Sequence, residues 1–243
     1  MLIHTRGIVF RTVKFGETSV IADIYTEDKG MHTFVAGGVR SARARMPFNL
    51  FQPMQVVDLV AYYREDPNAM NRLKELRAEV IFQRIPYDVS RGAVVLFLAE
   101  VCRKCIREAE ENRPLFEFLL HQLIWLDSTE GSIANTPVAF LVQLCGFLGF
   151  QPEWPETEGP FFFDLREGLF HEGPPVHGAY LGPDTTADLM AMMQATREES
   201  ASHVLDRFQR KRLLQGLLQY YQWHVPGFDG IHTPEVMEWV WGG

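Results

Sequence analysis

Residues 7 to 35 read GIVFRTVKFGETSVIADIYTEDKGMHTFV, and this stretch decides the fold class. Its start, from Ile8 to Val13, has the two-residue period that is typical of a strand. Ser19 to Tyr25 is rich in β-branched residues, and Met31 to Val35 follows the turn residue Gly30. The stretch therefore predicts three consecutive strands.

Two further strands are predicted downstream, at Gln55 to Tyr63 and at Leu73 to Phe82, the second with less regular alternation. Between the third and fourth strands, Ala44 to Phe51 is long enough for one short helical segment. Five strands with a helix after the third is the order of an OB-fold, a small and partly open barrel. We expect an OB-fold at residues 1–82, although the pattern also permits an SH3-like barrel.

After Pro86 the hydrophobic period becomes helical, with Ser90 as the expected N-cap of the first helix. We predict an all-α domain at residues 83–243, interrupted at about 151–183 by an irregular insertion rich in Gly, Pro and aromatic residues. The expected helices are 90–105, Leu115–Leu126, 136–147, Thr185–Thr196, Ala201–His224 and a short one from Pro234. The chain is thus predicted to be an α+β protein with a barrel followed by helices.

The composition indicates a globular protein, with 47% hydrophobic and 22% charged residues among 243. No apolar run reaches the ~20 residues that span a bilayer, and the first residues lack the pattern of a signal peptide. The three cysteines, Cys102, Cys105 and Cys145, do not suggest a disulfide framework. We therefore expect a cytoplasmic protein.

Charge is unevenly distributed along the chain, although the net value is −8. Residues 1–82 hold 11 Lys and Arg against 9 Asp and Glu, a balance of +2, and the rest of the chain has a balance of −10. Local potential, rather than the total, governs contact with phosphates. The front of the chain is therefore the part expected to bind a polyanion.

Basic residues occur at four places in this sequence, which are the first strand, the loop after the third strand, the last strand and a later helix. The expected nucleic-acid-binding residues of the front domain are Lys14, Arg40, Arg43, Arg45, Arg72 and Lys74, and a possible secondary set is Arg207, Arg210 and Lys211 on one helix face. Arginine forks match phosphate oxygens, and Gly37 and Gly38 give the first loop freedom to follow a backbone. Aromatic residues that could stack on bases are Phe15, Phe34, Tyr62 and Tyr63.

Catalytic and metal motifs are weak in this sequence. Cys102 and Cys105 have CxxC spacing but lie in the middle of a predicted helix, where a buried apolar role is favoured over redox chemistry. His171 and His177 could form a zinc site only with help from Asp164, Glu167 or Glu172, and solvated loop residues are the favoured interpretation. We find no serine-hydrolase, phosphate-loop or HExxH pattern, and therefore expect no enzyme and no cofactor.

The order of several short segments resembles the RecO family of bacterial recombination mediators. The matching segments are Gly7–Val9, Lys14–Ile21, Tyr25–Gly30, Gly37–Arg40, Phe51–Pro53, Asn112–Phe116 and Gly146–Pro152. The resemblance implies an N-terminal OB-fold, a helical domain and binding to single- and double-stranded DNA. It also implies strand annealing, and loading of RecA onto DNA coated by single-strand-binding protein, with RecR and in many bacteria RecF as partners.

Two features depart from this family pattern. Phe163 to Phe170 resembles the segment before the zinc site that some members build from two cysteine pairs, but no cysteine follows it here, so we expect no metal. No Lys or Arg occurs between Arg113 and Arg166, so the basic pocket that takes the tail of single-strand-binding protein in some members is not placed in this sequence. The alternatives are an RNA-binding OB protein and a protein-only adaptor.

Overall fold

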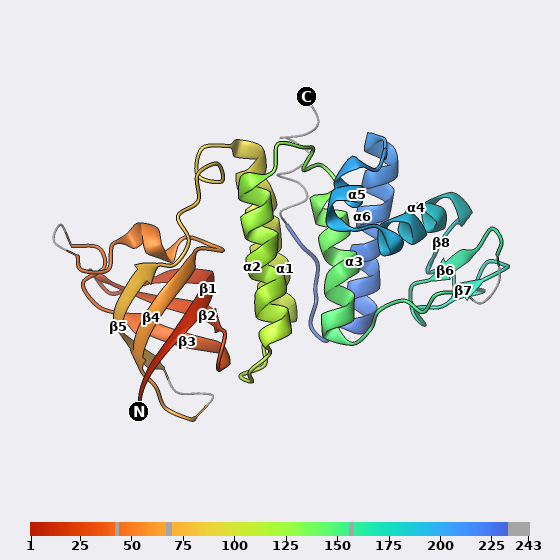
Figure 1. Cartoon of the computed structure of the whole chain (residues 1–243). Coiled ribbons are helices and arrows are strands. Elements are labelled where there is room, and N and C mark those ends of the chain that lie inside the picture. The colour runs from red at the N-terminus through yellow and green to blue at the C-terminus, as the bar shows by residue number, and fades with distance from the viewer. Residues whose placement is uncertain (42–43, 67–69, 156–157, 233–243) are drawn as a thin grey trace. The chain divides into compact units, whose positions relative to one another are not determined.

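The computed structural model describes residues 1–41, 44–66, 70–155 and 158–232. By internal contacts the chain divides into two compact units, Met1–Ser128 and Thr129–Gly243, called here the barrel unit and the second unit. The barrel unit holds the first two helices as well as the strands (Figure 1). The sequence-based boundary at residue 82 marks the change from strands to helices and stays a prediction.

Five strands close into a barrel in the order β1-β2-β3-β5-β4. Neighbours are antiparallel except β3 and β5, which are parallel. A 3-10 helix, η1, follows the third strand, so the predicted OB-type barrel is confirmed. The elements are β1 (Leu2–Phe15), β2 (Ser19–Thr26), β3 (Gly30–Ala36), η1 (Phe48–Phe51), β4 (Val56–Tyr62) and β5 (Asn71–Ala78).

The barrel closes because one face of each strand is apolar. Along β2, for example, Val20, Ala22 and Ile24 are fully buried while the residues between them are not. Phe34 of β3 and Leu59 of β4 fill the same core. Strand β2 was predicted from its β-branched residues, and burial of one face at every second position fixes its register.

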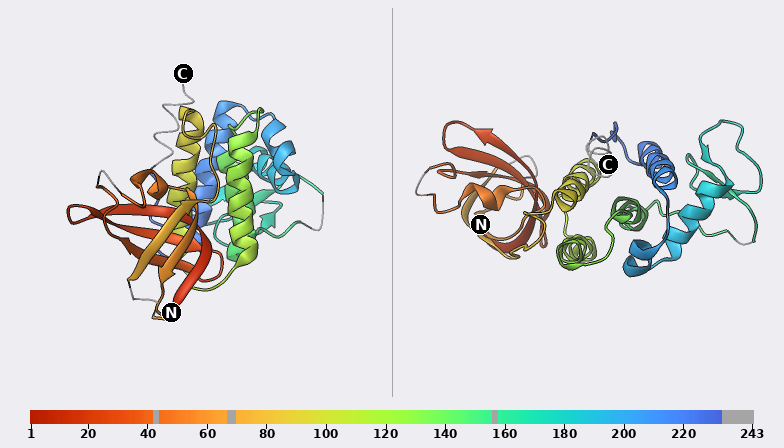
Figure 2. Two further views of the ribbon diagram at one scale, coloured as in Figure 1. Left: turned by 60° about the vertical axis from the view of Figure 1, so that its left-hand side comes forward. Right: turned by 90° about the horizontal axis from the view of Figure 1, so that it is seen from above.

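Two helices complete the barrel unit, α1 (Val89–Cys105) and α2 (Arg113–Ser128), which lie side by side (Figure 2). Helix α1 also contacts β1. The expected N-cap Ser90 is wrong, because Asp88 caps α1 and accepts from the backbone N–H groups of Ser90 and Arg91. The predicted last strand also ends earlier, at Ala78.

The second unit contains α3 (Thr136–Leu148), α4 (Pro183–Gln194), α5 (Arg197–Ser202) and α6 (Arg207–His224). Helix α3 is buried on nearly all sides, as its apolar composition predicts, and packs against α6. The predicted helix Ala201–His224 is wrong, because α5 ends at Ser202 and Asp206 caps a new helix. The short helix expected from Pro234 lies outside the described residues.

The insertion expected to be irregular contains a small sheet of order β7-β6-β8. Its strands are β6 (Phe162–Asp164), β7 (Phe170–His171) and β8 (Tyr180–Leu181). Phe163 of β6 is fully buried and packs on Tyr220 of α6. None of the helices in the described ranges combines the length and apolar character of a membrane span.

Candidate nucleic-acid interface

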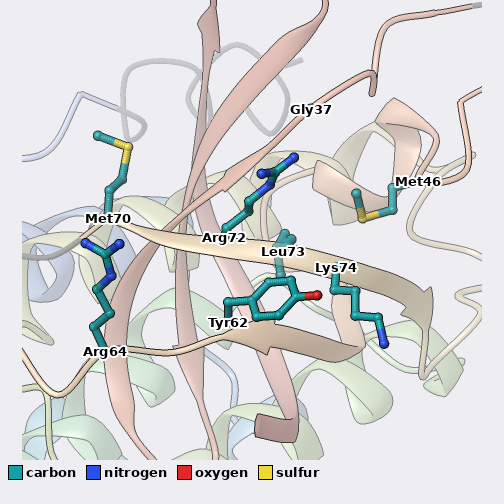
Figure 3. Close-up of a pocket in the computed structure, with 8 residues that line it drawn as sticks. All are labelled: Gly37, Met46, Tyr62, Arg64, Met70, Arg72, Leu73 and Lys74. Carbon is teal, nitrogen blue, oxygen red and sulfur yellow. The ribbon is translucent and has the colours of Figure 1, made fainter. Parts of the chain in front are cut away.

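A pocket of about 660 Å³ opens on the outer surface of the barrel. Its residues come from the end of β3, the segment before η1, the end of β4 with the residues after it, and the start of β5 (Figure 3). They are Gly37, Met46, Tyr62, Arg64, Met70, Arg72, Leu73 and Lys74. Two predicted binding residues, Arg72 and Lys74, are therefore brought together at one hollow of the surface.

The pairing of β4 with β5 explains why these side chains face outward. Tyr62 lies opposite Arg72, and Ala61 lies opposite Leu73, but the next pair is Val60 with Glu75. Lys74 is thus the extra residue of a β-bulge, a feature that re-aims side chains next to functional sites. Both Lys74 and Glu75 are exposed, while Leu73 stays in the barrel core.

The pocket is rich in cationic groups that are not neutralised by the barrel. Within the described residues, the guanidinium groups of Arg64 and Arg72 make no hydrogen bond or ion pair. The Lys74 ammonium lies 3.8 Å from Glu75 Oε1, and the other carboxylate oxygen, Glu75 Oε2, lies 3.6 Å from Arg77 Nη2. Exposed pairs of this kind are weak, so another anion such as a phosphate can replace Glu75 beside Lys74.

The loop after β3 begins and ends at this pocket, with Gly37 and Met46. Arg40 is exposed and is fixed to the β1–β2 turn, because its backbone N–H donates to Thr18 O at 3.1 Å and its side chain to Glu17 O at 3.3 Å. Arg45 is exposed beside Met46, whereas Arg43 lies outside the described residues. This loop therefore carries two exposed arginines, Arg40 and Arg45, between its two pocket residues.

Lys14 is exposed near the end of β1, opposite Val20 in the β1–β2 hairpin. The turn of this hairpin is the one that holds Arg40. The structure separates the four candidate stacking residues into two kinds: Phe34 and Tyr63 are buried, but Phe15 is 49% exposed and Tyr62 is 54% exposed. Only the latter two present a ring to solvent.

Besides Leu73 of β5, three pocket residues, Arg64, Met46 and Met70, were not predicted as site residues. They come from loops, and only the fold brings them beside β5. No periodic pattern marks such positions. The one available signal was the position of Arg64 directly after Tyr62 and Tyr63, at the end of a predicted strand.

The second basic cluster, on α6, is divided by its contacts. Arg210 is half-buried and donates to Asn135 Oδ1 at 2.9 Å and to Leu205 O at 2.9 Å, and burial lowers the pKa of its guanidinium. Asn135 in turn donates to the carbonyls of Ser200 and His203. Arg210 therefore stabilises the second unit through these hydrogen bonds. Arg207 and Lys211 are exposed.

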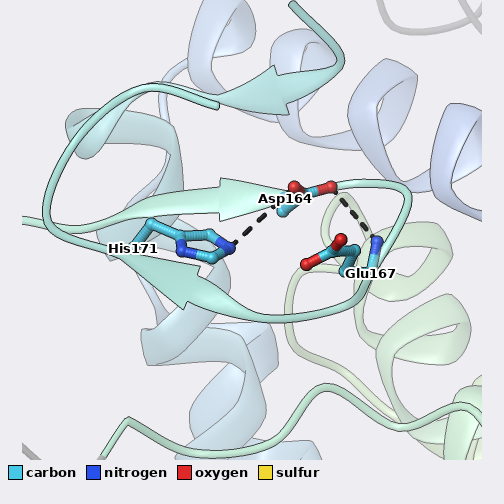
Figure 4. Close-up of side chains that lie close together, drawn as sticks. All are labelled: Asp164, Glu167 and His171. Atoms are coloured by element: carbon cyan, nitrogen blue, oxygen red, sulfur yellow. Dashed lines mark hydrogen bonds and ion pairs between the residues drawn. The ribbon is translucent and has the colours of Figure 1, made fainter. Parts of the chain in front are cut away.

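Asp164, Glu167 and His171 form a cluster in the small sheet, with their candidate ligand atoms within 4.8 Å of one another (Figure 4). The Asp164 carboxylate accepts from the backbone N–H groups of Arg166 and Glu167 at 2.7 and 3.1 Å, and from the His177 ring at 2.8 Å. Burial alone would raise the pKa of Asp164, but these donors outweigh it and leave the pKa below its ordinary value.

This cluster does not fit the cysteine-bound zinc that the sequence resemblance implies for some members of the family. The chain has no cysteine in the insertion, and the Asp164 oxygens already serve as acceptors that shape the turn. We expect purified protein to contain far less than one zinc per chain. Elemental analysis after exhaustive dialysis is the measurement, and a value near one zinc per chain would contradict the expectation.

Cys102, Cys105 and Cys145 are buried and are not joined in disulfides. Burial in α1, aided by nearby Cys105, raises the pKa of the Cys102 thiol well above its ordinary value. A thiol in this setting is a poor nucleophile and a poor metal ligand. The interpretation of the CxxC pair as buried apolar residues agrees with this placement.

Comparisons with known proteins cover nearly the whole chain. The family model for the N-terminal domain of recombination protein O matches residues 1–81, and the model for its C-terminal domain matches residues 86–229. The chain is 36% identical to the DNA repair protein RecO of Bacteroides fragilis over 240 residues, 98% of each chain. It is 32% identical to that of Christiangramia forsetii over 244 residues, with both chains fully covered. The chain therefore belongs to the RecO family of DNA repair proteins.

Proposed function

We propose that this protein is a DNA-binding recombination mediator. The observation that carries the proposal is the cationic pocket on an OB-type barrel in a chain of this family. In this role it anneals complementary strands and, together with RecR, promotes the loading of RecA onto DNA coated by single-strand-binding protein. RecF is a further proposed partner, and the proposed location is the cytoplasm.

The proposed DNA path runs over the barrel, from Lys14 and Arg40 past Arg45 to Arg72 and Lys74. Arg43 belongs to the same proposal from sequence alone. Clustered cations without an array of base-reading groups favour contact with phosphates, which carry no sequence information. Arg207 and Lys211 are a secondary proposal, and Arg210 is excluded from it by its hydrogen bonds to Asn135 and Leu205.

Neither matched family model describes a catalytic activity. The sequence contains no catalytic motif. In the described ranges, the Asp164 carboxylate accepts hydrogen bonds that stabilise its own turn. We therefore propose that the protein acts by binding and positioning DNA, without chemistry of its own.

The test of the proposal is the salt dependence of DNA binding. Each phosphate of single-stranded DNA that the protein ceases to neutralise flattens the slope of log affinity against log salt by roughly 0.7. The double variant Arg72→Gln/Lys74→Gln is therefore expected to flatten the slope by roughly 1.4, with similar effects on unrelated base sequences. Fluorescence anisotropy of labelled oligonucleotides over a salt series measures it.

A matched control removes the same charge from the same unit at another place. Arg103 at the end of α1 and Arg107 just after it are both exposed, and Arg103→Gln/Arg107→Gln is expected to keep the native slope. Equal slopes for both double variants would show that the pocket cations are not the DNA path. Native protein that bound structured RNA but not DNA, or that bound neither, would overturn the proposed DNA-binding function. Co-purification with RecR tests the proposed partnership with RecR.

A further inference from the structure

Tyr62 stands out in the pocket because it is a large aromatic residue at the end of a barrel strand that nevertheless lies 54% exposed. Figure 3 shows its side chain among the pocket residues, between Arg64 on one side and Lys74 on the other, with Arg72 above it. The buried aromatic residues of this barrel fill its core, as Phe34 does. Tyr62 contributes little to that core, so its ring is available to a ligand.

The surroundings of Tyr62 match the two chemical parts of a nucleotide. Met46 and Met70 provide flexible thioether side chains that adapt to a flat apolar ring. Arg64, Arg72 and Lys74 provide positive charge around the same ring, with Glu75 as the nearby counter-charge on Lys74. An aromatic face with cations at its border is the arrangement that binds a base by stacking and its phosphates by charge.

The shape of the site favours one form of DNA. In a duplex, both faces of each base are covered by its neighbours, so only phosphates and groove edges are offered to a protein. A base can lie on Tyr62 only after it leaves the stack, which costs least in a single strand. A pocket of about 660 Å³ falls within the range of sites that enclose small ligands, which is more than phosphate contact alone requires.

We propose that this pocket receives an unstacked base of single-stranded DNA on the ring of Tyr62, with the flanking phosphates on Arg64, Arg72 and Lys74. The proposal rests on the DNA-binding function proposed above and adds strand preference to it. The same barrel face binds duplex DNA through its cations alone. The preference for single-stranded DNA thus depends on the ring of Tyr62.

The experiment compares three variants of the full-length protein on three labelled DNA probes. The probes are an oligothymidylate, an abasic oligonucleotide of the same length with the same phosphates, and a duplex. Tyr62→Ala is expected to lower affinity for oligothymidylate by about 5- to 150-fold. Affinity for the abasic and duplex probes, and the salt slope, should stay at the native level because every cation that binds phosphate is still present.

Two further variants separate stacking from other effects. Tyr62→Phe keeps the ring and removes the hydroxyl, so it is expected to bind oligothymidylate like the native protein. Tyr87→Ala removes a tyrosine that is 86% exposed but lies before α1, away from the pocket residues, and is expected to have no effect. A thermal melt confirms that each variant is folded.

Native affinity of Tyr62→Ala for oligothymidylate, or an equal loss on all three probes, would overturn the base-binding proposal. Either result leaves the DNA-binding function standing if Arg72→Gln/Lys74→Gln still flattens the salt slope. Failure of the native protein to bind any of the probes would instead overturn the proposed function. A loss confined to oligothymidylate, restored in Tyr62→Phe, supports the proposal.

Discussion

Replacing Gly30 with alanine is expected to destabilise the barrel unit by about 2–4 kcal/mol. Gly30 begins β3 with a φ of +68°, a backbone conformation that residues with a Cβ rarely adopt. A Cβ at this position would also lie 2.3 Å from Glu110 O and 2.6 Å from Glu108 O. These are backbone atoms of the segment after α1, and they cannot move aside as a flexible side chain can.

This close approach joins the barrel to its helices. The N–H of Met31 donates to Glu108 O at 2.9 Å, and the Thr26 hydroxyl donates to Gly30 O at 2.9 Å across the β2–β3 turn. Any shift that relieved the clash would break these bonds. Hydrogen exchange of β2 and β3 peptides in the full-length protein is the measurement, with protection expected to fall by roughly one to three orders of magnitude.

Gly16 provides the matched control. It lies in the neighbouring β1–β2 turn with a φ of +65°, and a Cβ there would meet nothing within 4 Å. Gly16→Ala is therefore expected to cost only the backbone strain, about 1 kcal/mol. If both variants lost the same stability, contact with the segment after α1 would not be the reason that Gly30 is needed.

The first three strands were predictable from local signals, which are a two-residue period in β1, β-branched residues in β2 and a turn glycine before β3. Val20, Ala22 and Ile24 are buried in a row that can be read directly from residue types. The break between α5 and α6 was also readable but was missed. Thr196 with Glu199 and Asp206 with Gln209 both form capping boxes, a local signal that two helices begin where one was predicted.

The candidate site was predictable only in part, because its members depend on contacts between distant residues. Arg72 and Lys74 follow from charge on a strand, but the bulge that turns Lys74 outward comes from the register with β4. Arg210 looked equivalent to Arg207 until the fold placed it against Asn135, 75 residues away. The residue type identifies a candidate cation for DNA binding, but the tertiary structure determines whether the charge of that side chain is available to DNA.

The segment that joins β5 to α1 gives the clearest case of such a distant contact. The sequence suggested that the last strand continues to Phe82, but β5 ends at Ala78. Asp127, near the end of α2, accepts from the backbone N–H groups of Gln83, Arg84 and Ile85 at 2.8, 2.8 and 2.9 Å. Nothing near Phe82 in the sequence indicates that a carboxylate will take these donors.

Asp127→Ala is expected to lower the free energy of unfolding of the barrel unit by about 2–3 kcal/mol, because three donors lose a charged acceptor at once. Asp127→Asn should lose less, since an amide oxygen in the place of Oδ1 still accepts from Arg84 and Ile85, while its NH₂ group cannot accept from Gln83. Ser128→Ala, at the exposed next position, is the control and is expected to be nearly neutral. Hydrogen exchange of α1 and α2 peptides measures all three.

The pH dependence gives this prediction a second, independent readout. Burial would raise the pKa of Asp127, but the three N–H donors and the charge of Arg91 outweigh it and hold the pKa below its ordinary value. A carboxyl whose pKa is lower in the folded protein contributes stability that is fully present above the unfolded pKa of about 3.9. The stability gap between the native protein and Asp127→Asn should therefore be constant at neutral pH and should shrink as the pH falls through the lowered folded-state pKa. A gap that stayed constant down to the acid transition would show that Asp127 acts through its shape and not through its charge.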